Sequence, residues 1–315
     1  MKKALAIGEL LIDFVPRQKG CALGEVTDFE RVAGGAPANV ALAVSRLGGA
    51  GVMVSQVGLD AFGGYIIDTL KAGGVDTQYI FRTGKANTGL AFVSLDATGN
   101  REFSFYRNPS ADLFLSEEQI TPAMFADVGA LHFCSVDLVP WPVKDAHRKA
   151  IRLAREAGAF VSFDPNVRLP LWDSPESCQA AIREFLPLAD LVKLSDNEIE
   201  FVTGCADERE AARKLLADGC KMVLVTKGPD GAAVYTAQTE AQAAARPAQV
   251  ADTTGAGDCF AGSFLYQLLR DGVSRETLGT QDARTLAGYL DFSARCAAFT
   301  CGHKGAVMPT PDDIT

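Results

Sequence analysis

Short apolar runs that alternate with longer helical patterns constrain the fold of this chain more than any other feature. Each run has the length of a strand and ends in turn or polar residues, and the stretches between the runs carry apolar residues at helical spacing. The runs are ALAIGELLIDF, GVMVSQVG, ALHFCSV, AFVSFDPN, LVKLS and MVLVTKG. This alternation predicts an α/β protein with a central, mostly parallel sheet flanked by helices.

Polar side chains follow these predicted strands. In open parallel sheets, the ligand-binding groups gather at the carboxyl ends of the strands. The residues at the predicted ends are Asp13, Asp164, Asn166, Lys193, Asn197 and Thr226. We therefore expect a binding site at this edge of the sheet.

One region departs from the alternation of strands and helices. The stretch TGLAFVSLDATGNREFSFYRN contains two strand-like runs joined by residues 96–100, which predicts a β-hairpin. Three roles remain open for a hairpin outside the main sheet. It can pack on the core, pair with another subunit, or cover a site as a lid.

The composition is that of a globular protein with a sizeable core. The chain has 315 residues, of which 48% are hydrophobic and 22% charged, and no linker or repeat divides it, so we expect one domain over residues 1–315. The formal net charge of −9 argues against a nucleic-acid or anionic-membrane surface, because these need clustered Lys and Arg. No segment reaches membrane-spanning length.

The N-terminal run and the cysteines predict a cytoplasmic protein. The first apolar run is interrupted by Gly8 and Glu9, which leaves it too short for a signal peptide. The eight cysteines are scattered without a Cys-x-x-Cys pair, and there are only three histidines. This pattern indicates reduced thiols and disfavours a disulfide framework or a zinc site.

The stretch DTTGAGDCFAG, residues 252–262, runs three small residues into an aspartate and then into an apolar helical pattern. A helix that begins near Asp258 leaves its first amides free, and such amides bind anions such as phosphate. Gly255, Ala256 and Gly257 would allow the anion to come close. Taken alone, the stretch is better explained as a glycine turn with Asp258 as a capping residue.

A second glycine-flanked helix is predicted over GGAPANVALAVSRLGG, residues 34–49, with Pro37 in its first turn. Gly34 and Gly35 permit close approach by a ligand, and Asn39 offers a donor and an acceptor that suit a sugar hydroxyl. An ordinary helix between glycines is equally consistent with this stretch. A Walker-type phosphate loop and an early dinucleotide fingerprint are both absent from the sequence.

These two stretches resemble the two signature motifs of the ribokinase-like (PfkB) family of sugar kinases, and they occur in the family's order. GELLIDF, REFSFYRNPSAD, FDPNVRLPLW and NEIEFVTG resemble the fructokinase branch, so the resemblance covers nearly the whole chain. It implies a ribokinase-like fold with a small β-strand lid, whose strands lie within about residues 12–32 and 88–108. It also implies phosphorylation of a sugar by ATP with Mg²⁺.

The resemblance implies that Asp258 is the catalytic base that takes a proton from the sugar hydroxyl. Gly255, Ala256 and Gly257 would then form the anion hole for the transferred phosphate. This agrees with the residues themselves, because phosphoryl transfer needs positioning and charge neutralisation, which a helix start supplies.

The resemblance also implies a nucleotide and cation side. Asn197 and Glu200 match an Asn-x-x-Glu element in which Glu200 organises Mg²⁺ through water, although a solvated acidic helix explains the same residues. Asp252 and Thr254 match a monovalent-cation site, where a K⁺ ion would polarise the anion hole. The nucleotide-binding candidates are Lys193, Asn197, Thr226, Gly228 and Gly231.

For the sugar, the resemblance implies an aspartate at the end of the first strand, here Asp13. Arg107 and Arg168 are candidates to close over substrate or phosphate, although an arginine is more often a surface residue or a structural ion pair. The remaining sugar-binding candidates are Gly34, Gly35 and Asn39.

The favoured interpretation is an ATP-dependent kinase that converts D-fructose to fructose 6-phosphate and forms a homodimer through its lid strands. A 2-keto-3-deoxygluconate kinase and an aminoimidazole riboside or other riboside kinase share the mechanism and remain alternatives. A sugar- or nucleotide-binding protein without catalysis is more remote, because Asp258 is present with its full anion hole.

Overall fold

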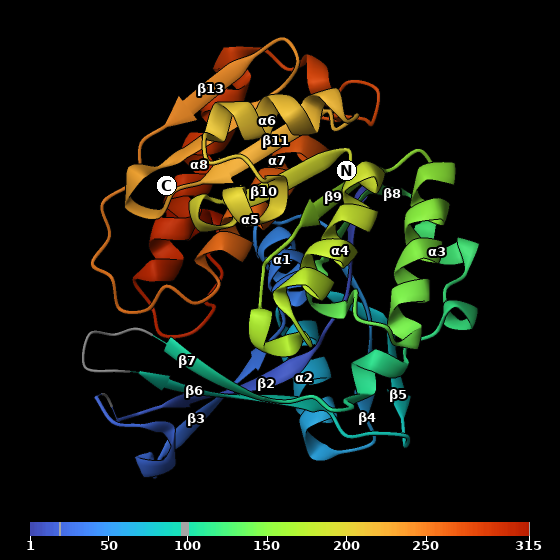
Figure 1. Cartoon of the computed structure of the whole chain (residues 1–315), viewed down its shortest axis with the longest axis vertical. Coiled ribbons are helices and arrows are strands. Elements are labelled where there is room, and N and C mark those ends of the chain that lie inside the picture. The colour runs from blue at the N-terminus through green and yellow to red at the C-terminus, as the bar shows by residue number, and fades with distance from the viewer. Residues whose placement is uncertain (19, 96–100, 315) are drawn as a thin grey trace.

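The computed structural model describes residues 1–18, 20–95 and 101–314 and contains two sheets. The large sheet has nine strands in the order β13-β12-β11-β10-β9-β8-β1-β4-β5, and the small sheet has four in the order β3-β2-β6-β7 (Figure 1). The large sheet comprises β1 (Lys3–Ile7), β4 (Gly51–Gly58), β5 (Asp76–Thr83), β8 (Val128–Cys134), β9 (Phe160–Asp164), β10 (Leu191–Ser195), β11 (Met222–Thr226), β12 (Ala232–Tyr235) and β13 (Glu240–Ala243). The small sheet comprises β2 (Leu11–Pro16), β3 (Phe29–Gly34), β6 (Gly89–Leu95) and β7 (Arg101–Tyr106).

The predicted parallel sheet is confirmed. All neighbouring strands from β5 to β11 pair in parallel, whereas β12 and β13 continue the sheet as antiparallel strands. Every apolar run named above contributes to at least one strand. The prediction missed β5, of which only Ile80 is buried, and the two short antiparallel strands β12 and β13.

Helices cover both faces of the large sheet. Strand β1 shows how the faces divide, because Leu5 and Ile7 pack in one core and Ala4 and Ala6 pack on the other side. The helices α3, α4, α5 and α6 cover the first face, and α1, α2, α7 and α8 cover the second. Their bounds are α1 (Ala36–Arg46), α2 (Ala61–Ala72), α3 (Pro142–Glu156), α4 (Pro175–Phe185), α5 (Ile199–Thr203), α6 (Glu208–Ala217), α7 (Ala256–Arg270) and α8 (Ala283–Cys301).

The first apolar run, interpreted as one strand, is divided between the two sheets. Strand β1 ends at Ile7, Gly8 follows with φ of +151°, and β2 begins at Leu11 in the small sheet. The placement of Asp13 at the end of the first strand was therefore wrong. Asp13 lies within β2, because the glycine lets the chain turn out of the large sheet.

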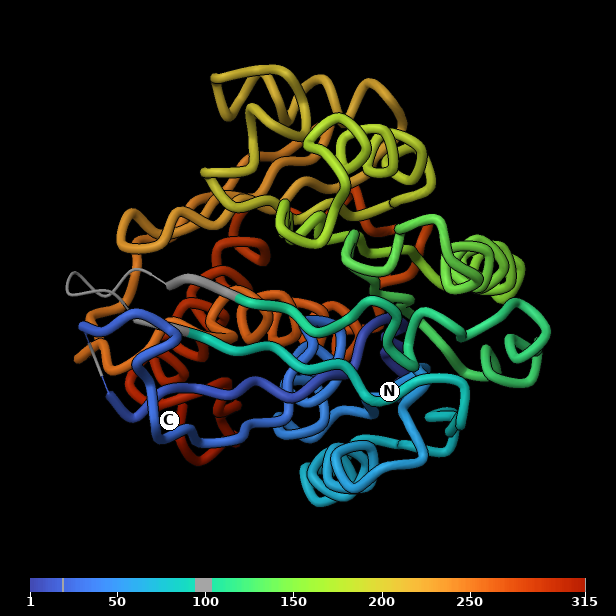
Figure 2. Tube along the Cα trace, turned by 60° about the horizontal axis from the view of Figure 1, so that its bottom comes forward, coloured from blue at the N-terminus to red at the C-terminus, as the bar shows by residue number. Residues whose placement is uncertain are grey.

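The predicted hairpin strands are β6 and β7, which pair antiparallel with Leu90 opposite Tyr106. The predicted turn, residues 96–100, lies outside the described residues. Strand β2 joins this pair by running parallel to β6, and Figure 2 shows the strands of the small sheet passing side by side across the front of the molecule. Phe14 and Phe92 stack across β2 and β6 with ring centroids 4.7 Å apart, which fixes the register of the small sheet.

Within the described residues, no helix combines the length and the apolar character needed to cross a membrane.

Helices α1 and α7 pack unusually closely at Gly262. A methyl group on this glycine would lie 2.7 Å from the Ala43 Cβ and 2.8 Å from the Val40 carbonyl oxygen. Both distances are shorter than van der Waals contact. The last glycine of DTTGAGDCFAG therefore sets the spacing of two helices.

We expect Gly262→Ala to destabilise the protein by about 1–3 kcal/mol, because the added methyl group forces α1 and α7 apart. The matched control is Gly288→Ala, since Gly288 is an exposed glycine in α8 with no atom within 4 Å of an added Cβ. The control should stabilise the protein by about 0.5–1 kcal/mol through helix propensity. Urea unfolding measures both, and equal effects at the two positions would contradict the close packing.

Candidate active site

The N-terminus of α7 forms the centre of the candidate site. Its N-cap is Gly255, with φ of +74°, and its first residue is Ala256. A side chain at Gly255 would strain this conformation and would collide with Ala306. The helix begins two residues earlier than predicted, so Asp258 lies in the first turn and does not cap it. The Ala256 amide donates to the Thr253 carbonyl at 3.3 Å, and the amides that follow it in this turn are placed to meet an anion.

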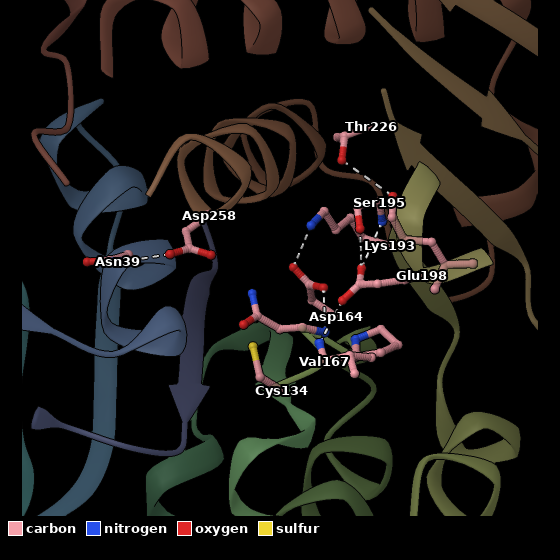
Figure 3. A network of polar contacts seen from close by, with 12 residues as sticks. Asn39, Cys134, Asp164, Val167, Lys193, Ser195, Glu198, Thr226 and Asp258 are labelled. Carbon is pink, nitrogen blue, oxygen red and sulfur yellow. Dashed lines mark hydrogen bonds and ion pairs between the residues drawn. The ribbon is translucent and has the colours of Figure 1, made fainter. Parts of the chain in front are cut away.

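Asp258 is held by a residue from the other glycine-flanked helix. The Asn39 side-chain amide donates a hydrogen bond of 2.8 Å to Asp258 Oδ2, which joins α1 to α7 (Figure 3). Burial raises the pKa of Asp258, although the bond from Asn39 and the charges of Lys193 and Arg168 partly offset this effect. A carboxylate of raised pKa is a better proton acceptor than an exposed one.

A buried ion pair lies beside the helix terminus. Lys193 Nζ in β10 is 2.9 Å from Asp164 Oδ2 at the end of β9, and both side chains are almost fully buried (Figure 3). Burial raises the pKa of Asp164 to about 6, against the attraction of Lys193. An added Cβ on Gly257 would lie 3.4 Å from the ammonium nitrogen, so this cation borders the Gly-Ala-Gly segment.

Glu198 belongs to the same network and was missed by the sequence interpretation. It accepts hydrogen bonds from the amides of Ser195, at 2.9 Å, and Val167, at 2.6 Å. Burial opposes its charge, but Lys193 and these bonds outweigh burial and lower the pKa of Glu198. The spacing of Ser195 and Glu198 is that of a capping box, which was the available sequence signal.

The predicted Asn-x-x-Glu pair lies outside this network. Asn197 and Glu200 are both exposed, although they follow β10 at the expected edge of the sheet. The two residues do not share one regular helix, because a 3-10 turn over Asp196–Glu198 precedes α5. Their exposure is consistent both with a solvated acidic segment and with a site that meets a hydrated cation.

The residues predicted to bind the sugar come mainly from the small sheet and α1. Gly34, at the end of β3, faces Asp13, and an added Cβ there would collide with the Asp13 carboxylate. Gly35 has φ of +124° and presses against the backbone carbonyl of Glu9. Arg168 is half-buried and close enough to Asp258 to lower its pKa. The structure therefore brings Asp13, Gly34, Gly35, Asn39 and Arg168 to one side of the site.

Arg107 forms a buried ion pair, which was the alternative to a contact with the substrate. It is 7% exposed, and its guanidinium contacts Asp112 and, at 2.6 Å, Asp137 Oδ1. The prediction that Arg107 closes over substrate conflicts with these contacts, because the two carboxylates already hold the end of its guanidinium.

The remaining nucleotide candidates lie beside Lys193 in the sheet. Thr226 ends β11, where it pairs with Ser195, and its hydroxyl donates to the Leu194 carbonyl at 3.4 Å. Gly228 and Gly231 follow in a tight turn with φ of +51° and +91°. These residues line the carboxyl edge next to the α7 terminus.

The two segments of the predicted cation site come together. Asp252 Oδ1 accepts from the Thr254 amide at 2.9 Å, and its Oδ2 accepts from the Gly305 amide at 2.9 Å. The loop GHKGA thus packs on the segment that precedes the Gly-Ala-Gly terminus. In the described parts of the chain, no group of three or more His, Cys, Asp or Glu side chains is arranged to hold a metal ion.

Known proteins resemble the chain over its full length. The model of the pfkB family carbohydrate kinases matches residues 1–313. A fructokinase-2 of Solanum lycopersicum is 42% identical over 308 residues, which cover 98% of this chain and 92% of the relative. These matches show that the chain belongs to the pfkB family of carbohydrate kinases.

Solved structures agree in fold. A crystal structure of fructokinase with bound ATP from Xylella fastidiosa superposes with a TM-score of 0.91 at 35% identity, covering 99% of this chain and 96% of that one. A fructokinase from Vibrio cholerae O395, solved in a fructose, ADP and calcium ion bound form, gives a TM-score of 0.87 at 32% identity over 100% and 98% of the chains. The ribokinase-like fold is confirmed.

Replacing Lys193 by Met should destabilise the protein by about 3–5 kcal/mol, because Asp164 would be left as an unpaired buried carboxylate. The double variant Lys193→Met with Asp164→Leu should recover most of this loss, since no buried charge then remains. Thermal and urea unfolding of both variants measure the coupling. Additive losses would contradict a direct ion pair.

Proposed function

We propose that this protein is an ATP-dependent fructokinase that phosphorylates the primary hydroxyl of D-fructose to give fructose 6-phosphate. The observation that carries the proposal is the buried Asp258 carboxylate in the first turn of α7, directly beside free helix amides and the Lys193 ammonium. The fructokinases among its relatives and a neighbour with fructose and ADP bound support the choice of substrate.

In this reaction Asp258 acts as the base. It accepts the proton of the sugar hydroxyl while the hydroxyl oxygen forms a bond to the γ-phosphorus of ATP. The bond from that phosphorus to the bridging oxygen breaks, and ADP leaves with the electron pair. Asn39 holds the carboxylate by its amide bond. The amides of Gly255, Ala256 and Gly257 and the charge of Lys193 stabilise the phosphoryl oxygens.

A divalent cation accompanies ATP, which agrees with the Mg²⁺ bound with ATP in a putative ribokinase II from E. coli. Mg²⁺ neutralises phosphate charge and is held mainly by phosphates and water with one or two carboxylates. Glu200 fits this mode, because it is exposed at the carboxyl edge of the sheet, whereas both Glu198 oxygens already accept hydrogen bonds from Val167 and Ser195. We therefore assign the water-mediated contact with the cation to Glu200.

A monovalent cation beside Asp252 and Thr254 completes the proposed anion hole. The junction of Asp252 with Gly305 supports this position, because it lies next to the Gly255 cap. A K⁺ ion there would strengthen the positive potential at the α7 terminus. The nucleotide itself is proposed to lie along Lys193, Asn197, Thr226, Gly228 and Gly231.

The small sheet is proposed to act as a lid on the single kinase domain and as the dimer interface. Its outer face is aromatic, with Phe29 and Tyr106 each packed edge-on against Phe92. Tyr106 is 63% exposed, an exposure that a second copy would remove. The eight cysteines are free thiols, which supports a cytoplasmic location.

A test of the substrate measures ADP production with ATP and Mg²⁺ over D-fructose, 2-keto-3-deoxygluconate, ribose, adenosine and an aminoimidazole riboside. We expect activity with fructose. Turnover of another sugar alone would leave the role of Asp258 intact but refute the substrate assignment. Absence of ADP production with every sugar would favour a binding protein that lacks catalysis.

Asp258→Asn should lower turnover by at least about a hundredfold, because the amide cannot accept the hydroxyl proton. Binding of ATP and fructose should persist, since the side chain keeps its size and place. Isothermal calorimetry measures binding, and coupled ADP detection measures turnover. Asp196→Asn, at an exposed aspartate near the site, is the control and should remain active. Near-normal turnover of Asp258→Asn would exclude its role as the base.

A further inference from the structure

A buried cluster of one arginine and three carboxylates lies where the lid joins the core. Arg107 Nη2 contacts Asp112 Oδ2 and lies 2.6 Å from Asp137 Oδ1, and the charge of Glu9 also acts on this arginine. All four residues are buried, with at most 7% of their surface exposed. Asp137 follows β8 of the large sheet, so the cluster connects both sheets.

All four lid strands begin or end at this cluster. Strand β2 begins two residues after Glu9, and β3 ends two residues before Ala36, whose amide donates to Glu9 Oε1 at 2.8 Å. Strand β7 ends directly before Arg107. Strand β6 begins at Gly89, where an added Cβ would lie only 3.1 Å from the Arg107 side chain.

We infer that Glu9 is a positioning residue for sugar phosphorylation, which fixes the base of the lid against the first turn of α1. The lid carries Asp13, whereas α1 carries Asn39, the hydrogen-bond partner of Asp258. The bond from the Ala36 amide to Glu9 therefore sets the position of the sugar-binding carboxylate relative to the catalytic base. This inference rests on the proposed kinase function and adds a residue that touches neither sugar nor nucleotide.

The charges around Glu9 explain why its hydrogen bond matters more than its charge. Burial raises the pKa of Glu9 to about 7, although Arg107 and the Ala36 amide favour the ionised form. Asp112 and Asp137 already supply two carboxyl contacts to the single arginine, and burial raises the pKa of Asp137. A neutral side chain at position 9 that still accepts from Ala36 is therefore compatible with the cluster.

The test compares Glu9→Met, which removes the acceptor at similar length, with Glu9→Gln, which keeps an acceptor without the charge. We expect Glu9→Met to raise the KM for fructose by about ten- to hundredfold, with a smaller effect on kcat and none on the KM for ATP. Glu9→Gln should restore a KM within about threefold of the wild type. A role in stability alone would lower the amount of active enzyme without this division between the two substrates.

Asp190→Leu is the matched control. Asp190 is also a buried carboxylate that accepts from a backbone amide, that of Val161, but it precedes β10 at the opposite edge of the sheet. The Asp190→Leu variant should be less stable than the wild type and should keep the wild-type KM for fructose. If Glu9→Met does not fold, Glu9→Asp tests the same bond, because its shorter side chain cannot reach Ala36.

The outcomes separate the two hypotheses. A wild type without fructokinase activity refutes the proposed function. An active wild type with an unchanged fructose KM in folded Glu9→Met or Glu9→Asp refutes the positioning role. Hydrogen exchange of β6 and β7 gives a second measure, since fructose should protect these strands in the wild type and in Glu9→Gln but less in Glu9→Met. Equal protection in all three overturns the inference.

Discussion

The hydrogen bond between Asn39 and Asp258 is the contact on which the site depends. It joins the first turns of two helices that are far apart in sequence, and it forms only because α1 and α7 approach closely at Gly262. That close approach in turn requires the large sheet, which supports both helices on one face. The amides, the carboxylate and the Lys193 ammonium therefore meet as a result of core packing, without a dedicated loop.

Electrostatics in the site follow from burial beside compensating partners. Lys193 and Asp164 would each be costly alone, but together they place a cation beside the free amides of α7. Glu198 keeps its charge because backbone amides and Lys193 surround it. Nearby carboxylates thus balance the positive charge of Lys193 and of the α7 terminus when no phosphate is bound.

Much of the fold could be predicted because strand runs and glycine-flanked helices depend on local patterns. The parallel sheet, α1, the α7 terminus and the β6–β7 pair were predicted from such patterns. The division of the first run was missed, since the φ of Gly8 is not visible in an apolar pattern. Asp13 was placed in the wrong element for the same reason.

The site was predicted less completely, because contacts between distant segments leave little local signal. The half-buried position of Glu198 and the exposure of Glu200 depend on where a 3-10 turn gives way to α5, which residue spacing alone does not determine. Arg107 was interpreted as a substrate contact from the family resemblance; of its two carboxylate partners, Asp112 lies five residues away and Asp137 lies thirty residues away along the chain. Pairing across that separation is a property of the folded core.

The placement of Asp13 in the small sheet and of Asp258 in a helix on the large sheet has an evolutionary consequence. The proposed base and anion hole belong to helices packed on the large sheet, whereas Asp13 belongs to the small one. Under the proposed assignment, substitutions in β2, β3, β6 and β7 alter the preferred sugar while the proposed phosphoryl-transfer groups remain unchanged. This architecture allows the substrate preference to change in related kinases while the catalytic groups on the large sheet are kept.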